Sequence, residues 1–188
     1  MENIKKIDAK LVESVALVLY NLNSIPESEA DGMIRLSPMQ RIANRSAIQL
    51  LNKQSELFEF CFVCFKARNS SRDCLFTILF ISHVIWETFR TAGWRNRPID
   101  RGKICATLGE NYRVHLADSR FLSKYIQNTN FLRQPALLLY IHNALENNHS
   151  TCPCGELSKK EKYDLFIFLK TIVDVIDDDF QEQIKEAI

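Results

Sequence analysis

The amino-acid sequence predicts an all-α fold, a single-domain bundle of six to eight helices around a buried central helix at about residues 71–92. Three observations support this prediction. Hydrophobic residues recur at helical spacing along most of the chain. Glycine and proline are scarce, with five of each among 188 residues, which disfavours a hairpin-rich β fold. Residues 74–86 are almost entirely apolar, and a helix that is apolar on every side must be enclosed by other elements.

The N-terminal part of the chain predicts two helical segments. The first covers about residues 8–23, and an acidic loop follows it. The second begins near Ser37, which has the spacing of a capping box with Gln40 and precedes a proline in the first turn. Helical spacing then continues for nearly thirty residues without a turn signal. We therefore expect one long or kinked helix that includes the aromatic segment at 58–65.

The central helix has recognisable start and stop signals. Ser70 and Asp73 have the spacing of a capping box, and Gly93 follows the last apolar turn. A membrane-spanning helix needs about 20 apolar residues. The apolar run at 74–86 is shorter than this, so we expect a buried core helix and no membrane contact.

Further helical segments are predicted after the central helix. One covers about residues 100–116, where Gly109 predicts a break or a close contact. A short helix is expected at about 118–126, and Pro135 opens another helix.

The last long helix is predicted to begin at the capping box formed by Ser158 and Glu161. The acidic residues Asp177–Asp179 fall near its expected C-terminus, where negative charge opposes the helix dipole. This placement predicts either that the helix ends before Asp177 or that the acidic cluster has a role. A short helix at 180–188 would then close the chain.

Composition limits the function classes. A length of 188 residues suits one domain that spans 1–188, and a net charge of +1 disfavours a globally basic nucleic-acid binder. The first ten residues, MENIKKIDAK, lack the apolar region of a signal peptide. We therefore expect a cytoplasmic protein whose six cysteines are reduced thiols.

A basic connector follows the central helix at residues 90–103. Arginine binds phosphate through two parallel hydrogen bonds, and tryptophan can stack on a nucleobase. The connector therefore predicts contact with phosphate, nucleic acid or a protein partner. Alternatively, its cations pair with the acidic residues at 174–179. The residues of this prediction are Arg90, Trp94, Arg95, Arg97, Arg101 and Lys103.

A loop with His149, Cys152 and Cys154 carries the ligand types that zinc prefers. Cys61 and Cys64 form a second pair, which would lie one turn apart on an apolar helix. A metal site is one interpretation of these residues. The other is that the loop holds exposed thiols and the helix holds small buried residues. We expect no resident cofactor, and zinc is the metal that this loop would hold.

His83 and Glu87 are spaced by four residues on the central helix, a spacing that can share a metal or a proton. Glu56 and Glu59 precede them, but none of these glutamates is followed by a histidine three residues later, as di-metal bundles require. A hydrogen-bonded histidine inside a buried helix is the favoured interpretation.

The sequence contains no nucleophile elbow, no glycine-rich phosphate loop and no zinc-protease motif, so no catalytic residue is assigned. Twelve phenylalanines supply a large apolar load. We expect a non-enzymatic helical interaction or regulatory protein that self-associates and contacts its partner through an apolar groove beside the central helix. RNA or DNA binding by the connector and a metal site in the cysteine loop are the alternatives.

Overall fold

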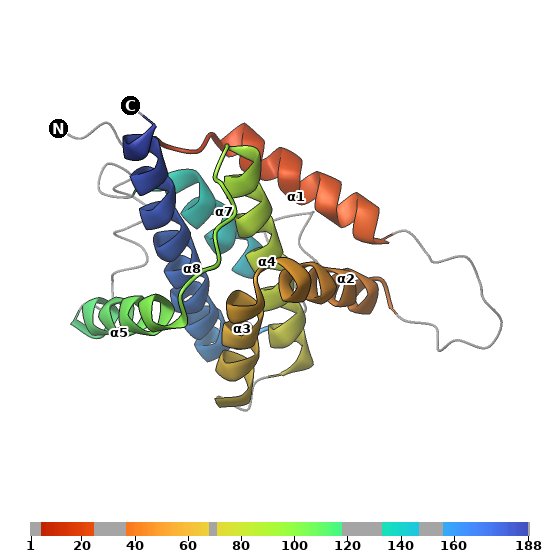
Figure 1. Ribbon diagram of the computed structural model, residues 1–188. Helices are drawn as coiled ribbons and strands as arrows, with labels where there is room; N and C mark the ends of the chain where they lie inside the picture. Colours follow the sequence, from red (N-terminus) through yellow and green to blue (C-terminus); the bar gives the residue numbers. More distant parts are fainter. Residues whose placement is uncertain (1–4, 25–36, 68–70, 118–132, 147–155, 188) are drawn as a thin grey trace.

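The computed structural model describes residues 5–24, 37–67, 71–117, 133–146 and 156–187. Within these ranges the chain forms helices and no strand, which confirms the predicted all-α bundle (Figure 1). None of the described helices combines the length and apolar character needed to cross a membrane. The helices are α1 (Ala9–Ser24), α2 (Pro38–Lys53), α3 (Ser55–Ala67), α4 (Arg72–Thr91), α5 (Arg101–Ala117), α7 (Pro135–Leu145) and α8 (Lys159–Glu186).

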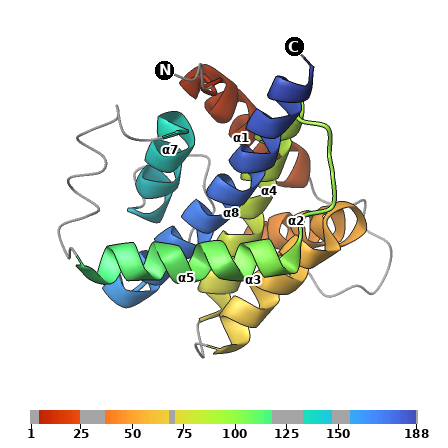
Figure 2. The same ribbon diagram turned by 60° about the vertical axis from the view of Figure 1, so that its left-hand side comes forward.

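Helix α4 is the predicted central helix and lies at the middle of the bundle. It packs against α1, α2, α3 and α8. Phe80 and Phe89 are nine positions apart and therefore point to opposite sides of the helix, yet both are fully buried. Helices α5 and α7 pack on α8 instead, and α5 lies across it (Figure 2).

The central helix and α8 run parallel, because their ends meet in matching order. At the N-terminal ends, a carboxylate oxygen of Glu161 accepts a hydrogen bond of 3.1 Å from the backbone N–H of Ser71. Towards the other end, the rings of Phe89 and Phe180 meet edge to face. Beyond it, the indole Nε1–H of Trp94 donates to Asp179 over 2.6 Å. The pair is thus fixed at both ends, by an exposed hydrogen bond at the N-terminal ends and by buried or half-buried contacts at the other.

The start of α4 differs from the prediction by one residue. Its N-cap is Ser71, whose Oγ accepts from the backbone N–H of Cys74, whereas Ser70 lies outside the described residues. Asp73 lies two residues after Ser71, whereas a capping box needs an acceptor three residues after the N-cap. The backbone N–H of Ser71 instead donates to the carboxylate of Glu161 from α8. The sequence pattern could not show this acceptor because it comes from another helix.

Glu161 also completes the predicted capping box of α8 with Ser158. One carboxylate therefore bonds the amides of two helix N-termini, both of which carry partial positive charge. These backbone hydrogen bonds lower the pKa of Glu161 to about 2.

Helix α4 stops just before Gly93, as predicted. Gly93 has a positive φ of 104°, a conformation that glycine adopts without a Cβ clash. The N–H of Gly93 bonds the carbonyl of Arg90, and the N–H of Trp94 bonds that of Phe89. This pair of bonds forms a Schellman motif, which turns the chain sharply and directs Trp94 back onto the core.

The long or kinked helix expected after Ser37 is two helices separated by a single residue. The capping box of Ser37 and Gln40 is present, and residues 58–65 are helical, but the chain breaks between α2 and α3 at Gln54. The Gln54 side chain is buried; it donates to the carbonyl of Arg97 and accepts from the N–H of Ile99. These long-range bonds favour the break, which is why no local turn signal marks it.

Of the two alternatives for Asp177–Asp179, a helix end before Asp177 is wrong, because α8 continues without interruption to Glu186 and includes the predicted short helix. The other alternative holds, since the acidic cluster has a structural role. The dipole argument does not apply, since the acidic residues lie inside the helix and each has a partner. Asp177 accepts from Gln134, Asp178 pairs with Arg133 and Lys103, and Asp179 accepts from Trp94. These three successive residues hold the start of α7, the start of α5 and the connector after α4.

Two segments without helical structure are held by glutamine side chains. Gln183 accepts from the N–H of Arg95 and donates to its carbonyl, so one side-chain amide satisfies both backbone groups. Gln134 does the same for the N-terminal segment, accepting from Ile7 N–H and donating to the Lys5 carbonyl. Buried backbone groups need such partners where no helix supplies them.

Two smaller predictions concern the middle of the chain. Gly109 neither breaks α5 nor makes a close contact, since no atom lies within 4 Å of a Cβ built there. The short helix expected at 118–126 lies outside the described residues.

Replacement of Glu161 by alanine tests the link between the two helix N-termini. We expect Glu161→Ala to lower the free energy of unfolding by roughly 1–2 kcal/mol, as for loss of a helix cap. Because the folded-state pKa of Glu161 lies below its ordinary value of 4.5, this stabilisation is present above pH 4.5. It should disappear as pH falls towards about 2. Urea unfolding of the wild type and the variant at several pH values measures both effects.

The matched control is Glu182→Ala, which removes an exposed glutamate from the same helix. We expect it to change the free energy of unfolding by less than about 0.5 kcal/mol. Equal losses in the two variants would contradict the assigned role of Glu161.

Candidate functional site

The basic connector is bound to the surface of the bundle. Trp94 is only 3% exposed and its indole nitrogen donates to Asp179, so its ring offers no open face for stacking on a nucleobase. The backbone of Arg95 is held by Gln183. The connector is therefore a structural strap across the C-terminal end of the α4–α8 pair.

Most cations of the connector have acidic partners. The predicted pairing with the C-terminal acidic residues is confirmed for Arg97, which contacts Asp179 and Glu186, and for Lys103, which contacts Asp178. The other two pairs lie elsewhere, Arg90 with Glu87 and Arg101 with Glu59.

These pairs bear on the predicted phosphate contact. Each of them would have to open before its cation could bind phosphate. Of the five cations of the connector, all within the described ranges, only Arg95 has no acidic partner there. The phosphate contact stays a prediction.

The predicted zinc ligands, His149, Cys152 and Cys154, lie outside the described residues, so that site also stays a prediction. In the part of the chain that the structure describes, no three metal-ligating side chains gather. Cys61 is fully buried and lies 3.4 Å from the hydroxyl of Ser82. Burial raises the pKa of its thiol to about 12, so Cys61 is a core residue and not a nucleophile.

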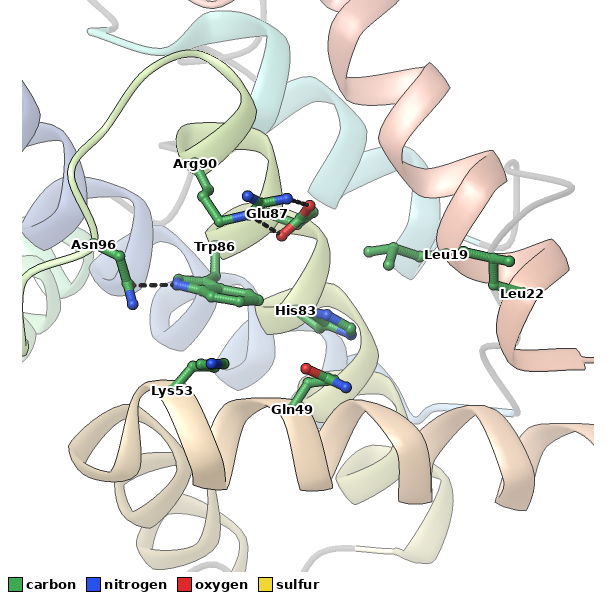
Figure 3. Close-up of a pocket in the computed structure, with 9 residues that line it drawn as sticks. All are labelled: Leu19, Leu22, Gln49, Lys53, His83, Trp86, Glu87, Arg90 and Asn96. Atoms are coloured by element: carbon green, nitrogen blue, oxygen red, sulfur yellow. Dashed lines mark hydrogen bonds and ion pairs between the residues drawn. The ribbon is translucent and has the colours of Figure 1, made fainter.

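A groove beside the central helix lies between α1, α2 and α4, where such a groove was expected. Its volume is about 480 Å³. In Figure 3 the side chains of Gln49 and Lys53 on α2 point towards α4, and two leucines of α1 lie at the end of the groove away from Lys53. The residues that line it are Leu19, Leu22, Gln49, Lys53, His83, Trp86, Glu87, Arg90 and Asn96.

The floor of the groove consists of two stacked rings. The ring centroids of His83 and Trp86 are 5.7 Å apart, and both residues are buried. Ser46 bonds His83 Nδ1 at 3.2 Å, and Asn96 accepts from Trp86 Nε1 at 2.8 Å. The floor is thus rigid, with each ring held by one hydrogen bond.

His83 carries no charge at neutral pH. Burial lowers its pKa to about 4, and the nearby carboxylate of Glu87 only partly opposes this effect. Glu87 itself is engaged by Arg90, which donates from Nε over 2.7 Å and from Nη2. The favoured interpretation of His83 as a hydrogen-bonded histidine in a buried helix is confirmed, because the side chain is buried and its Nδ1 bonds Ser46.

Charge in the groove is unbalanced. Lys53 has no ion pair within the described ranges, whereas Arg90 and Glu87 neutralise each other. The amide nitrogen of Asn96 also has no acceptor there. The groove therefore has one uncompensated positive charge and spare hydrogen-bond donors at the end formed by Lys53 and Asn96.

Exposed apolar residues concentrate on the helices that flank the groove. Of the seven large hydrophobic side chains that are exposed among the described residues, five belong to α1 and α2. Leu22 lines the groove and is 56% exposed. The other four belong to the same two helices but do not line the groove. The five are Leu17, Val18, Leu22, Ile48 and Leu51.

A second cavity of about 500 Å³ lies among α5, α7 and α8. Its charged residues neutralise one another within the cavity or at its rim. Lys170 bonds Asp174 and Asn111, and Asp178 pairs with Arg133. No charge there awaits a ligand, so we select the first groove as the candidate site.

Comparison with protein-family models, curated proteins and solved structures found no match to this chain.

The sequence predicted a groove beside the central helix but not its residues. Gln49, Lys53 and Trp86 were missed because only the packing of α2 on α4 brings them together. One signal was present: Ile48 and Leu51 are hydrophobic yet fall outside the buried stripe of their helix.

The buried neutral His83 predicts a pH dependence of stability. Between pH 6.5 and about 4 the unfolded chain binds a proton that the folded protein does not, so stability falls as pH falls. We expect this term to cost about 2.5 kcal/mol between pH 7.5 and 4.5. In His83→Gln the free energy of unfolding should fall less steeply over this range, as urea unfolding at each pH would measure.

Ser46→Ala is the matched comparison, since it removes the hydrogen bond and leaves the imidazole buried. We expect it to lower stability while keeping the wild-type pH slope. Burial raises the pKa of Asp177, so the contribution of this carboxyl group to stability increases as pH falls, opposite to that of His83. All three proteins contain Asp177, so this contribution cancels in the comparison. Parallel pH profiles for the wild type and His83→Gln would refute the assignment.

Proposed function

We propose that this protein is a non-enzymatic interaction protein and that the groove between α1, α2 and α4 binds an apolar segment of a protein partner. The observation that carries the proposal is the coincidence of an open groove with the exposed apolar side chains of its two flanking helices. A rigid aromatic floor with an apolar rim is typical of grooves that accept a partner helix. The cytoplasmic location expected from the sequence belongs to the same proposal.

The groove favours binding over catalysis. Its histidine is neutral and held by Ser46, and its only carboxylate, that of Glu87, is occupied by Arg90. The hydroxyl of Ser46 that His83 contacts is fully buried, so this pair is closed to a substrate. Leu19, Leu22 and Trp86 supply apolar contact area, and the other six lining residues are polar or charged, a mixture that suits recognition.

Binding can be measured with a synthetic amphipathic helical peptide that has leucines at i, i+3, i+4 and i+7 and glutamine on its outer face. We expect wild-type protein to bind it in a fluorescence anisotropy titration. Leu22→Asp places a charge on the apolar rim and should weaken binding at least tenfold. Circular dichroism should show an unchanged fold, because Leu22 is exposed.

The control is Leu139→Asp, since Leu139 is a similarly exposed leucine on α7. It should leave the affinity unchanged. Equal effects of the two substitutions, or no binding by the wild type, would overturn the proposal. Self-association remains part of the proposal, and sedimentation velocity of the peptide-free proteins over a concentration series measures it.

A further inference from the structure

We infer that the partner segment in the groove is an amphipathic helix that carries an acidic side chain beside its apolar stripe, with the carboxylate placed against Lys53. This inference rests on the proposed function and names the chemistry of the partner, a separate protein. It follows from the length of the groove, from its backbone and from the distribution of charge along it.

The length of the groove suits a short helical contact. Its floor and one wall extend along α4 from His83 to Arg90, which is about 10 Å at 1.5 Å per residue. Gln49 and Lys53 are one turn apart on α2 and line the same cavity. About two turns of a partner helix match this length.

The walls of the groove favour a helix over an extended peptide. Apart from Asn96, all lining residues belong to α1, α2 or α4, whose backbone groups bond within their own helices. An extended segment needs backbone partners, which helical walls do not offer. A helix satisfies its own backbone and presents only side chains.

The two ends of the groove differ in chemistry. Leu19 and Leu22 close one end, whereas Lys53 and Asn96 lie at the other, as Figure 3 shows. An apolar residue therefore fits against the leucines. At the other end, the uncompensated ammonium of Lys53 and the free amide hydrogens of Asn96 complement a carboxylate.

Charge reversal tests the inference. The probes are the leucine-bearing peptide described above and two versions of it with glutamate or lysine at one position flanking the apolar stripe. At low salt the glutamate peptide should bind wild-type protein roughly five- to tenfold more tightly than the lysine peptide. Lys53→Glu should reverse this order, and added salt should reduce the difference.

Lys160→Glu is the control for net charge. Lys160 is an exposed lysine at the start of α8 with no partner among the described residues. This variant should keep the wild-type preference for the glutamate peptide. If Lys160→Glu reverses the preference as well, the effect is one of overall charge and the inference is overturned.

The remaining outcomes separate the inference from the proposed function. If all three peptides bind equally and Leu22→Asp abolishes their binding, the acidic partner is wrong and the groove still binds a helix. If no peptide binds the wild type, both fail. If the peptides are excluded because the protein is already dimeric through this groove, the occupant is a second copy and the inference is overturned.

Discussion

The apolar circumference of α4 is the constraint on which the rest of the structure depends. A helix whose opposite faces carry Phe80 and Phe89 cannot leave either face in water, so other helices must surround it. Helix α8 covers one side along its whole length, and the parallel arrangement of the two helices requires their like dipole ends to lie together. Glu161 offsets this repulsion at the N-terminal ends, where one carboxylate accepts from both. The Schellman turn and the strap that follows it fix the other end.

The groove is where this enclosure is incomplete. Helices α1 and α2 each contact α4, but they diverge from one another, and the stacked rings of His83 and Trp86 form the floor between them (Figure 3). Buried or half-buried acidic residues elsewhere have partners: Asp177 accepts from Gln134, Asp178 pairs with Arg133 and Lys103, and Asp179 accepts from Trp94. The groove instead keeps an unpaired lysine and an exposed leucine. Recognition sites commonly retain the polar and apolar groups that a folded interior would have satisfied.

Local signals in the sequence predicted most helices and several of their ends, because a cap such as Ser37 with Gln40 or a stop such as Gly93 acts over a few residues. The break at Gln54 and the uninterrupted course of α8 could not be predicted in this way. Both depend on side chains distant in sequence: Gln54 bonds residues 97 and 99, and Asp177 bonds Gln134. The same reason explains the site. A groove beside the central helix was expected from composition, whereas its lining residues come from three helices and Asn96, whose relative positions no local pattern encodes.

The two tryptophans of the chain offer the most direct test of the claim that this groove binds the partner. The indole N–H of Trp86 donates to Asn96 at the groove, and that of Trp94 donates to Asp179 on α8. In a ¹⁵N-labelled sample titrated with the glutamate-bearing helical peptide, the Trp86 indole resonance should move in a saturable manner while that of Trp94 stays in place. Movement of Trp94 with Trp86 unchanged, or binding that moves neither resonance, would contradict the account.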